Sequence, residues 1–162
     1  MSRDLSLARA VARLREFPVL CLFLIQAKGT SMSRHPSIKN LKDMEYESHY
    51  LNKPAEKYRV RKRVGKTLGT KNLGLNVSRL APGQVSSEFH FHTKEEELIV
   101  ITKGRVTLRL GNETFVLEEE DVISFPPNGE PHQLINNFDL ECLYLEMSTR
   151  HPDDRVVYPE KT

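Results

Sequence analysis

Cysteine, long apolar runs and net charge are all scarce in this sequence, and each shortage excludes a class of protein. The two cysteines, Cys21 and Cys142, are too few for a disulfide framework or a zinc ribbon, and a reducing, cytoplasmic location is expected. The apolar run at residues 19–25 is shorter than the about 20 residues that a membrane-spanning helix needs. A net charge of +2 does not indicate a nucleic-acid or membrane partner.

The first 31 residues differ from the rest of the chain. Leu7, Val11 and Leu14 fall at helical spacing, which predicts a short amphipathic helix over residues 5–17. Residues 1–31 are therefore interpreted as an N-terminal extension, and a targeting segment, a docked helix and a dispensable leader stay open as its role. Met32 is a second candidate start, and residues 32–56 are expected to form an irregular lead-in.

A basic stretch comes next. Residues 57–87 contain no acidic residue and eight basic ones: Lys57, Arg59, Arg61, Lys62, Arg63, Lys66, Lys71 and Arg79. A solvated edge strand is favoured over a phosphate or nucleic-acid patch, because no aromatic residues alternate with the charges. The sequence shows no arginine pair that would recognise a substrate at the mouth of a barrel.

From about Lys57 onward the hydrophobic pattern has the two-residue period of β-strands. Val106, Leu108 and Leu110 share one face, and Gly111-Asn112 supplies a two-residue turn, which together predict a hairpin. Eight or nine short strands, without a helix long enough for a βαβ unit, predict an all-β antiparallel sandwich or barrel. We expect the barrel over residues 57–147 and an arm over it at residues 148–162.

The segment FHFHTKEEELIVITKG, residues 89–104, places two histidines and three glutamates at the start of an apolar strand. His90 and His92 are expected to point the same way, because residues i and i+2 of a strand share a face. A turn after them allows Glu97 to lead the next strand inward, and a Pro/Gly loop before His132 can bring that side chain beside the pair. Such a set can hold a divalent metal with open positions; a solvated charge run beside incidental histidines is the alternative.

Two segments resemble the two motifs of the cupin superfamily. PGQVSSEFHFHTKEEELIVITKG is similar to the first motif, with these residues at its places: Gly83, His90, His92, Glu97 and Gly104. EDVISFPPNGEPHQLIN is similar to the second, through Pro127, Gly129, His132 and Asn136. Glu120 replaces the usual glycine and Asn128 lengthens the proline loop, so the departures affect turns. The resemblance implies a double-stranded β-helix (jelly-roll) cupin barrel.

The resemblance also implies a bound divalent metal ion, with Fe(II) or Mn(II) favoured and Zn(II) or Ni(II) as further candidates. Its ligands would be His90, His92, Glu97 and His132. Glu97 is preferred to Glu96, because the strand-leading position can point inward while its neighbour then points outward. Glu88 shares the parity of the histidines and is a remote third candidate.

The reaction is left open by the sequence, since this fold hosts many activities. We expect a small polar metabolite as ligand or substrate, handled by a metal-dependent dioxygenase or a sugar isomerase or epimerase, with a non-catalytic binding or sensing module as the alternative. A proton-transferring group could come from the face of Tyr144, Cys142 and Glu146, or from His151 or Tyr158.

A homodimer is expected as the oligomeric state. Phe89 and Phe91 fall on the strand face opposite His90 and His92, so they point outward if the histidines point into a barrel. Outward phenylalanines need cover from a second sheet or a partner subunit.

Overall fold

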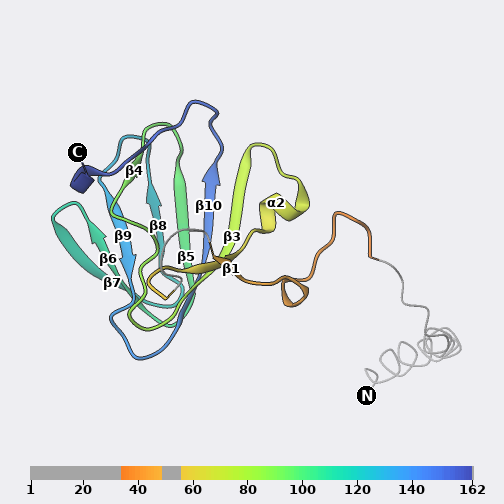
Figure 1. Ribbon diagram of the computed structural model, residues 1–162, viewed down its shortest axis with the longest axis horizontal. Helices are drawn as coiled ribbons and strands as arrows, with labels where there is room; N and C mark the ends of the chain where they lie inside the picture. Colours follow the sequence, from red (N-terminus) through yellow and green to blue (C-terminus); the bar gives the residue numbers. More distant parts are fainter. Residues whose placement is uncertain (1–33, 49–55, 162) are drawn as a thin grey trace, which may run out of the picture. The chain divides into compact units, whose positions relative to one another are not determined.

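The computed structural model describes residues 34–48 and 56–161 (Figure 1). The helix expected over residues 5–17 and the extension at residues 1–31 lie outside these residues. Nearly all of the described residues belong to one compact unit, His35–Thr162. Its few helices are short: η2 (Leu41–Asp43), α2 (Val64–Leu68) and η3 (Pro159–Lys161). Among the described helices, none is long and apolar enough to cross a membrane.

Antiparallel strands make up the body of this unit. The larger sheet has six strands in the order β1 (Glu47–Ser48), β2 (Val60–Lys62), β3 (Leu73–Leu80), β10 (Cys142–Thr149), β5 (Glu97–Lys103), β8 (Val122–Phe125). The smaller sheet has the order β7 (Glu113–Leu117), β6 (Val106–Leu110), β9 (His132–Ile135). A third pair joins β4 (Phe91–His92) to β11 (Val156–Val157). Neighbouring strands are distant in sequence, as in a jelly roll, and the all-β double-stranded β-helix expected from the sequence is confirmed.

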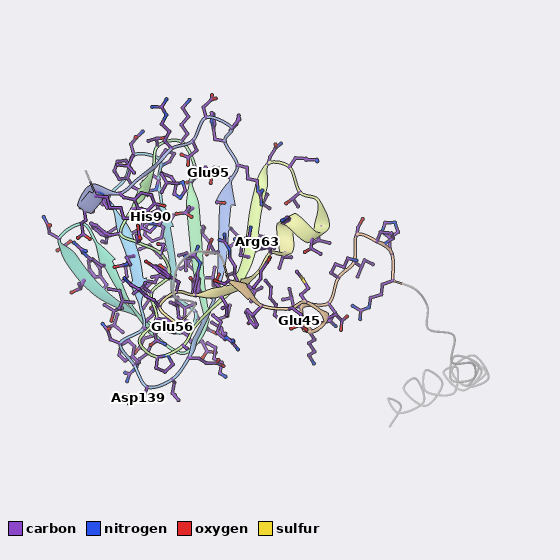
Figure 2. All side chains as sticks on the ribbon, in the orientation of Figure 1. Glu45, Glu56, Arg63, His90, Glu95 and Asp139 are labelled. Atoms are coloured by element: carbon purple, nitrogen blue, oxygen red, sulfur yellow. The ribbon has the colours of Figure 1, made fainter. Side chains whose placement is uncertain are left out.

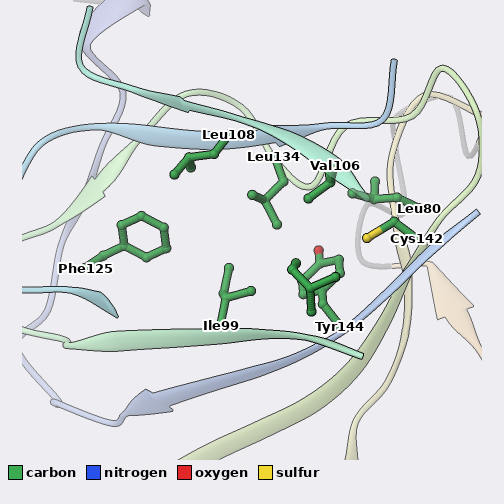
Figure 3. Close-up of a cluster of buried hydrophobic side chains, with 9 residues drawn as sticks. Leu80, Ile99, Val106, Leu108, Phe125, Leu134, Cys142 and Tyr144 are labelled. Atoms are coloured by element: carbon green, nitrogen blue, oxygen red, sulfur yellow. The ribbon is translucent and has the colours of Figure 1, made fainter. Parts of the chain in front are cut away.

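The hydrophobic core lies between the two sheets. Figure 3 shows Leu108 and Leu134 from the smaller sheet facing Ile99 and Tyr144 from the larger one. The alternation of buried and less buried residues along β6 and β9 follows the two-residue period of a strand. The predicted hairpin is confirmed, because β6 and β7 pair through Leu110 and Glu113 around Gly111-Asn112.

The inner face of the larger sheet changes from apolar to polar along its strands. On β10 the inward positions pass from the buried Cys142 and Tyr144 to Glu146 and Ser148, which line a cavity. The paired strand β3 changes in the same way, because its inward face runs from Leu80 at one end to Asn76 near the other. One end of the barrel is therefore a packed core and the other end is a polar cavity.

The basic stretch corrects a prediction. It is not a solvated edge strand: Arg59 is 8% exposed, Arg61 is 9% exposed, and β2 lies between β1 and β3. The regular strand is also shorter than the pattern indicated, because α2 begins at Val64. The physical reason is that a two-residue period does not say which face is inside, and at this end of the barrel Glu146 offers the arginines a buried carboxylate.

Candidate metal centre

Backbone pairing brings the two histidine-bearing segments together. His90, just before β4, and His132, at the start of β9, form an antiparallel bridge. The N–H of His132 donates to the carbonyl of His90 at 2.8 Å, and the reverse bond is 3.2 Å long. His92 ends β4 and Glu97 begins β5, so one short turn separates these two residues. Residues up to 42 positions apart in the sequence thus become neighbours.

The four side chains converge into one group, which we call the His/Glu cluster: His90, His92, Glu97 and His132. The ring of His90 lies 5.3 Å from that of His92 and 4.8 Å from that of His132, between centroids. Oε2 of Glu97 lies 3.1 Å from Nε2 of His132 and 3.7 Å from Nε2 of His92. Ligand atoms of His90, His92 and Glu97 all lie within 4.8 Å of one another, which is close enough for one metal ion.

The two other glutamates considered from the sequence lie elsewhere. Glu96 is exposed and offers the cluster no contact among the described residues; its backbone N–H donates to Oγ1 of Thr149. Glu88 accepts a hydrogen bond from the hydroxyl of Tyr58 and forms an ion pair with Lys161. Of the three glutamates, Glu97 alone joins the histidines in this structure.

The Nδ1 atoms of two histidines are held by partners behind the cluster. Nδ1 of His90 lies 2.8 Å from the carbonyl oxygen of Glu88 and 3.1 Å from Oγ of Ser87. A carbonyl can only accept, so Nδ1 of His90 carries the proton and its Nε2 keeps a free lone pair. Nδ1 of His92 lies 2.6 Å from Oδ2 of Asp154. Such outer hydrogen bonds fix the tautomer and orientation of metal-binding histidines.

Asp154 is a site residue that the sequence reasoning missed. It lies in the C-terminal arm, whose strand β11 pairs with β4. Its Oδ1 accepts hydrogen bonds from the backbone N–H groups of Lys94 (2.8 Å) and Glu95 (3.2 Å). Burial acts in the opposite direction, but the hydrogen bonds from His92 and these N–H groups hold the pKa of the Asp154 carboxyl far below its usual value. No spacing or motif signal links it to a histidine 62 positions earlier.

His132 is fixed by packing. Its ring is 5% exposed and stacks on Phe125, with centroids 3.6 Å apart and planes 10° from parallel. Its Nδ1 is buried and has no hydrogen-bond partner among the described residues. The ring is therefore oriented by its aromatic neighbour and by Glu97.

Charge states in the cluster fit a cation. Burial, followed by the neighbouring His132, lowers the pKa of His90 to about 4, so this imidazole is neutral at pH 7. Burial opposes ionisation of Glu97, but the hydrogen bond from His132 and the electrostatic influence of the neighbouring histidines outweigh it and hold the pKa of its carboxyl below the usual value. A neutral imidazole and an ionised carboxylate are the forms that bind metals. The donor set therefore fits a divalent metal ion.

A cavity of about 630 Å³ opens at the cluster and is lined by His90, His92 and Glu97. Figure 2 labels His90, Glu95 and Arg63, which come from three of the segments around it. Its basic side chains are here called the basic wall: Arg59, Arg61, Arg63, Lys66, Lys71 and Arg150. The expectation that no arginine pair marks the barrel mouth is therefore wrong, because Arg59, Arg61 and Arg63, in and beside β2, line the cavity.

Some of the candidate proton-transferring groups are buried in the core, and others line the cavity. Tyr144 and Cys142 are fully buried in the core, and burial raises the pKa of both, that of Cys142 to about 11. Glu146 lines the cavity, but Arg59 and Arg61 hold its carboxylate at 3.3 and 3.1 Å. The arm residues His151 and Tyr158 also line the cavity.

The ring of Tyr158 lies 5.9 Å from that of His90, between centroids. Outside the cluster and the basic wall, the cavity is also lined by Glu95, Glu146, His151 and Tyr158, and the arginines hold Glu146. Of the candidate proton-transferring groups, His151 and Tyr158 therefore line the cavity without an arginine partner among the described residues.

Comparison with known proteins agrees with this architecture. The model of the cupin domain matches residues 76–148, a range that holds all four members of the His/Glu cluster. Together with the jelly-roll topology, the match defines the class: the chain is a small cupin-domain protein. No curated protein matches it.

Solved structures with the same fold include enzymes. A cupin-superfamily sugar phosphate isomerase from Silicibacter pomeroyi is 26% identical, with a TM-score of 0.69 over 75% of this chain and 80% of that one. A candidate sugar phosphate isomerase from Acidithiobacillus ferrooxidans is also 26% identical, with a TM-score of 0.69 over 78% and 83%. The polyketide cyclase RemF from Streptomyces resistomycificus, at 22% identity and a TM-score of 0.61 over 75% and 86%, shares the fold.

Proposed function

We propose that the protein is a metal-dependent isomerase or epimerase of a small polar metabolite, with His90, His92, Glu97 and His132 as the metal ligands. The observation that carries this proposal is the convergence of three imidazoles and one carboxylate at the wall of a polar cavity. Mn(II) or Fe(II) is the favoured ion, and Zn(II) or Ni(II) would suit the same donors. A bound divalent ion would polarise a substrate carbonyl and so acidify the neighbouring C–H.

The chain's own side chains would supply the rest of the reaction. His151 and Tyr158 line the cavity and are proposed to move the proton between neighbouring carbons. Asp154 holds the ring of His92, and Phe125 holds that of His132, so both rings keep their orientation when a molecule enters. The sugar phosphate isomerase and the candidate sugar phosphate isomerase that share the fold at 26% identity support this reaction type over an oxygenase.

Metal content is the first test. The full-length protein, purified without added metal, is analysed by elemental mass spectrometry beside His92→Ala and Glu97→Ala. Glu96→Ala is the matched control, because Glu96 is exposed and outside the cluster. We expect near-stoichiometric metal in the wild type and in Glu96→Ala, and loss of metal in the other two variants. No metal in the wild type, even after incubation with the four ions named above, would overturn the proposal.

Turnover is the second test. Candidate sugars and sugar phosphates are incubated with the metal-loaded protein in D₂O without oxygen, and deuterium at the carbon beside the carbonyl is followed by NMR. Incorporation that is lost in Glu97→Ala supports an isomerase. A product that forms only with oxygen consumption would make the protein a dioxygenase, and a stabilising ligand that never yields product would make it a binding module.

A further inference from the structure

Positive charge dominates the cavity that the His/Glu cluster shares. Its lining holds six basic side chains, those of the basic wall, and three acidic ones, Glu95, Glu97 and Glu146. One of the three, Glu97, belongs to the cluster. Desolvated positive charge is costly unless a negative charge accompanies it. The electrostatics of the cavity therefore favour an anionic ligand.

The inner part of the basic wall is preformed. Arg59 and Arg61 are nearly buried, and Glu146 holds them by contacts of 3.3 Å and 3.1 Å. Asn76 and Ser78 donate to the same carboxylate at 3.2 and 3.3 Å, so its acceptor positions are occupied. Burial, followed by the neighbouring Arg59, lowers the pKa of Arg61. An additional anion at this wall would relieve that crowding of cations.

The outer part of the wall carries the cations that are available to a ligand. Lys66 on α2, Lys71 in the following turn and Arg150 after β10 are exposed, and within residues 34–48 and 56–161 they form no ion pair. The backbone beneath them is fixed, because the N–H of Arg150 donates to Asn72 at 3.0 Å and that of Thr70 to Gly65 at 3.0 Å. Two chain segments are thereby held with their charges over one cavity.

Sheet order separates this wall from the cluster. Arg61 lies on β2 and Glu97 on β5, with β3 and β10 between them. Neighbouring strands are about 4.8 Å apart, so the two strands lie about 15 Å from each other along the sheet, and long side chains reach inward from both. A small elongated molecule can therefore contact both ends of one cavity.

We propose that the basic wall is an anion subsite, where Lys66, Lys71 and Arg150 bind the phosphate or carboxylate group of the substrate. The other end of the same molecule then lies at the His/Glu cluster. This inference rests on the proposed function only for the placement of the reacting end of the substrate at the cluster. Anion binding at the basic wall itself needs no metal. The substrate class becomes a small anionic metabolite, of which a phosphorylated sugar or a sugar acid is the simplest kind.

Binding to the metal-stripped full-length protein tests the subsite. Glycerol 3-phosphate, glycerate and glycerol are titrated in turn by calorimetry at low ionic strength. The variants are Lys71→Gln and the triple variant Lys66→Gln/Lys71→Gln/Arg150→Gln; all three positions are exposed, so folding is preserved. Lys103→Gln is the matched control, because Lys103 is exposed, pairs with Glu141 and does not line the cavity. Metal content of each variant is measured in parallel.

We expect the phosphate or the carboxylate to bind and glycerol not to bind, and the stronger of the two anions identifies the group. Affinity should fall severalfold in Lys71→Gln and at least about tenfold in the triple variant, at unchanged metal content, with Lys103→Gln within about twofold of the wild type. Equal binding of glycerol, or equal anion affinity in the triple variant, would overturn the subsite. Anion binding at the wall of a protein that takes up no metal would keep the subsite and overturn the proposed function.

Discussion

A single carboxylate connects the C-terminal arm to the His/Glu cluster. Asp154 accepts from Nδ1 of His92 through one oxygen and from two backbone N–H groups of the turn after β4 through the other. The same side chain therefore orients an imidazole and fixes the loop that leads to Glu97. Its effect on the cluster is one of positioning, since it contacts His92 from behind.

Asp154→Asn should weaken metal binding. The amide keeps the size of the side chain but removes the charged acceptor that orients His92, and loss of such a partner costs roughly 10- to 100-fold in metal affinity. Competition with a chelating dye measures the affinity, and thermal unfolding shows whether the fold persists. Asp153→Asn is the control, because Asp153 is 72% exposed and contacts Lys94. An unchanged affinity in Asp154→Asn would show that His92 needs no orienting carboxylate.

For individual residues, the sequence predicted which side chains share a strand face. Strand parity placed His90 and His92 together and Glu97 rather than Glu96 beside them, and the structure has this arrangement. Strand parity could not predict that Arg61 points inward, because both faces of β2 carry residues that could lie in the core or on the surface. Nor could it find Asp154, whose contact depends on where the C-terminal arm folds back.

Single strands carry both the core and the site. The inner face of β10 passes from Tyr144 in the core to Glu146 in the cavity within one step of the two-residue period. Hydrophobic periodicity found such strands because it reports alternation, and it located the hairpin of β6 and β7 through its turn residues. It could not detect α2, since five residues are too short to establish a helical period.

Gly104, in the turn between β5 and β6, should be more sensitive to substitution than Gly69 after α2. Both have positive φ angles, +77° and +74°, which cost an alanine about 1–2 kcal/mol. A Cβ at Gly104 would also lie 2.6 Å from the carbonyl oxygen of Glu141, whereas nothing lies within 4 Å at Gly69. Urea unfolding should show Gly104→Ala less stable than Gly69→Ala by at least about 1 kcal/mol. Equal losses would mean that the turn moves to accommodate the methyl group.

The metal-stripped molecule should lose stability as the pH falls from about 6.5 to about 4. Burial, followed by His132, lowers the pKa of folded His90 to about 4, while its unfolded value is near 6.5. Over this window the unfolded chain binds the proton first, so protonation favours unfolding by up to the order of 3 kcal/mol. Urea midpoints measured at steps of pH test this.

The matched variant for that series is His90→Gln, which cannot take up the proton. Its urea midpoint should vary less with pH between about 6.5 and about 4 than that of the wild type. The same slope in both proteins would assign the loss of stability to other groups.

The homodimer stays a prediction. Phe89 no longer argues for it, because Arg109 of the same chain covers its ring at 3.7 Å. Exposed apolar side chains lie elsewhere, at Phe115 and Val116 on β7 and Val122 on β8. Light scattering after size exclusion should give twice the chain mass, and Val116→Asp should shift it toward the monomer, whereas Leu140→Asp, at a residue 76% exposed in a loop, should not. A monomeric wild type would contradict the prediction.

The contact between Asp154 and His92 also has a consequence for synthesis on the ribosome. All four members of the cluster emerge before the arm does, so a nascent chain halted after β10 holds three imidazoles and a carboxylate without the group that orients His92. Metal captured at that stage would be held loosely and exchanged readily. Tight loading would have to wait for translation of the arm, because Asp154 follows all four members of the cluster in the chain.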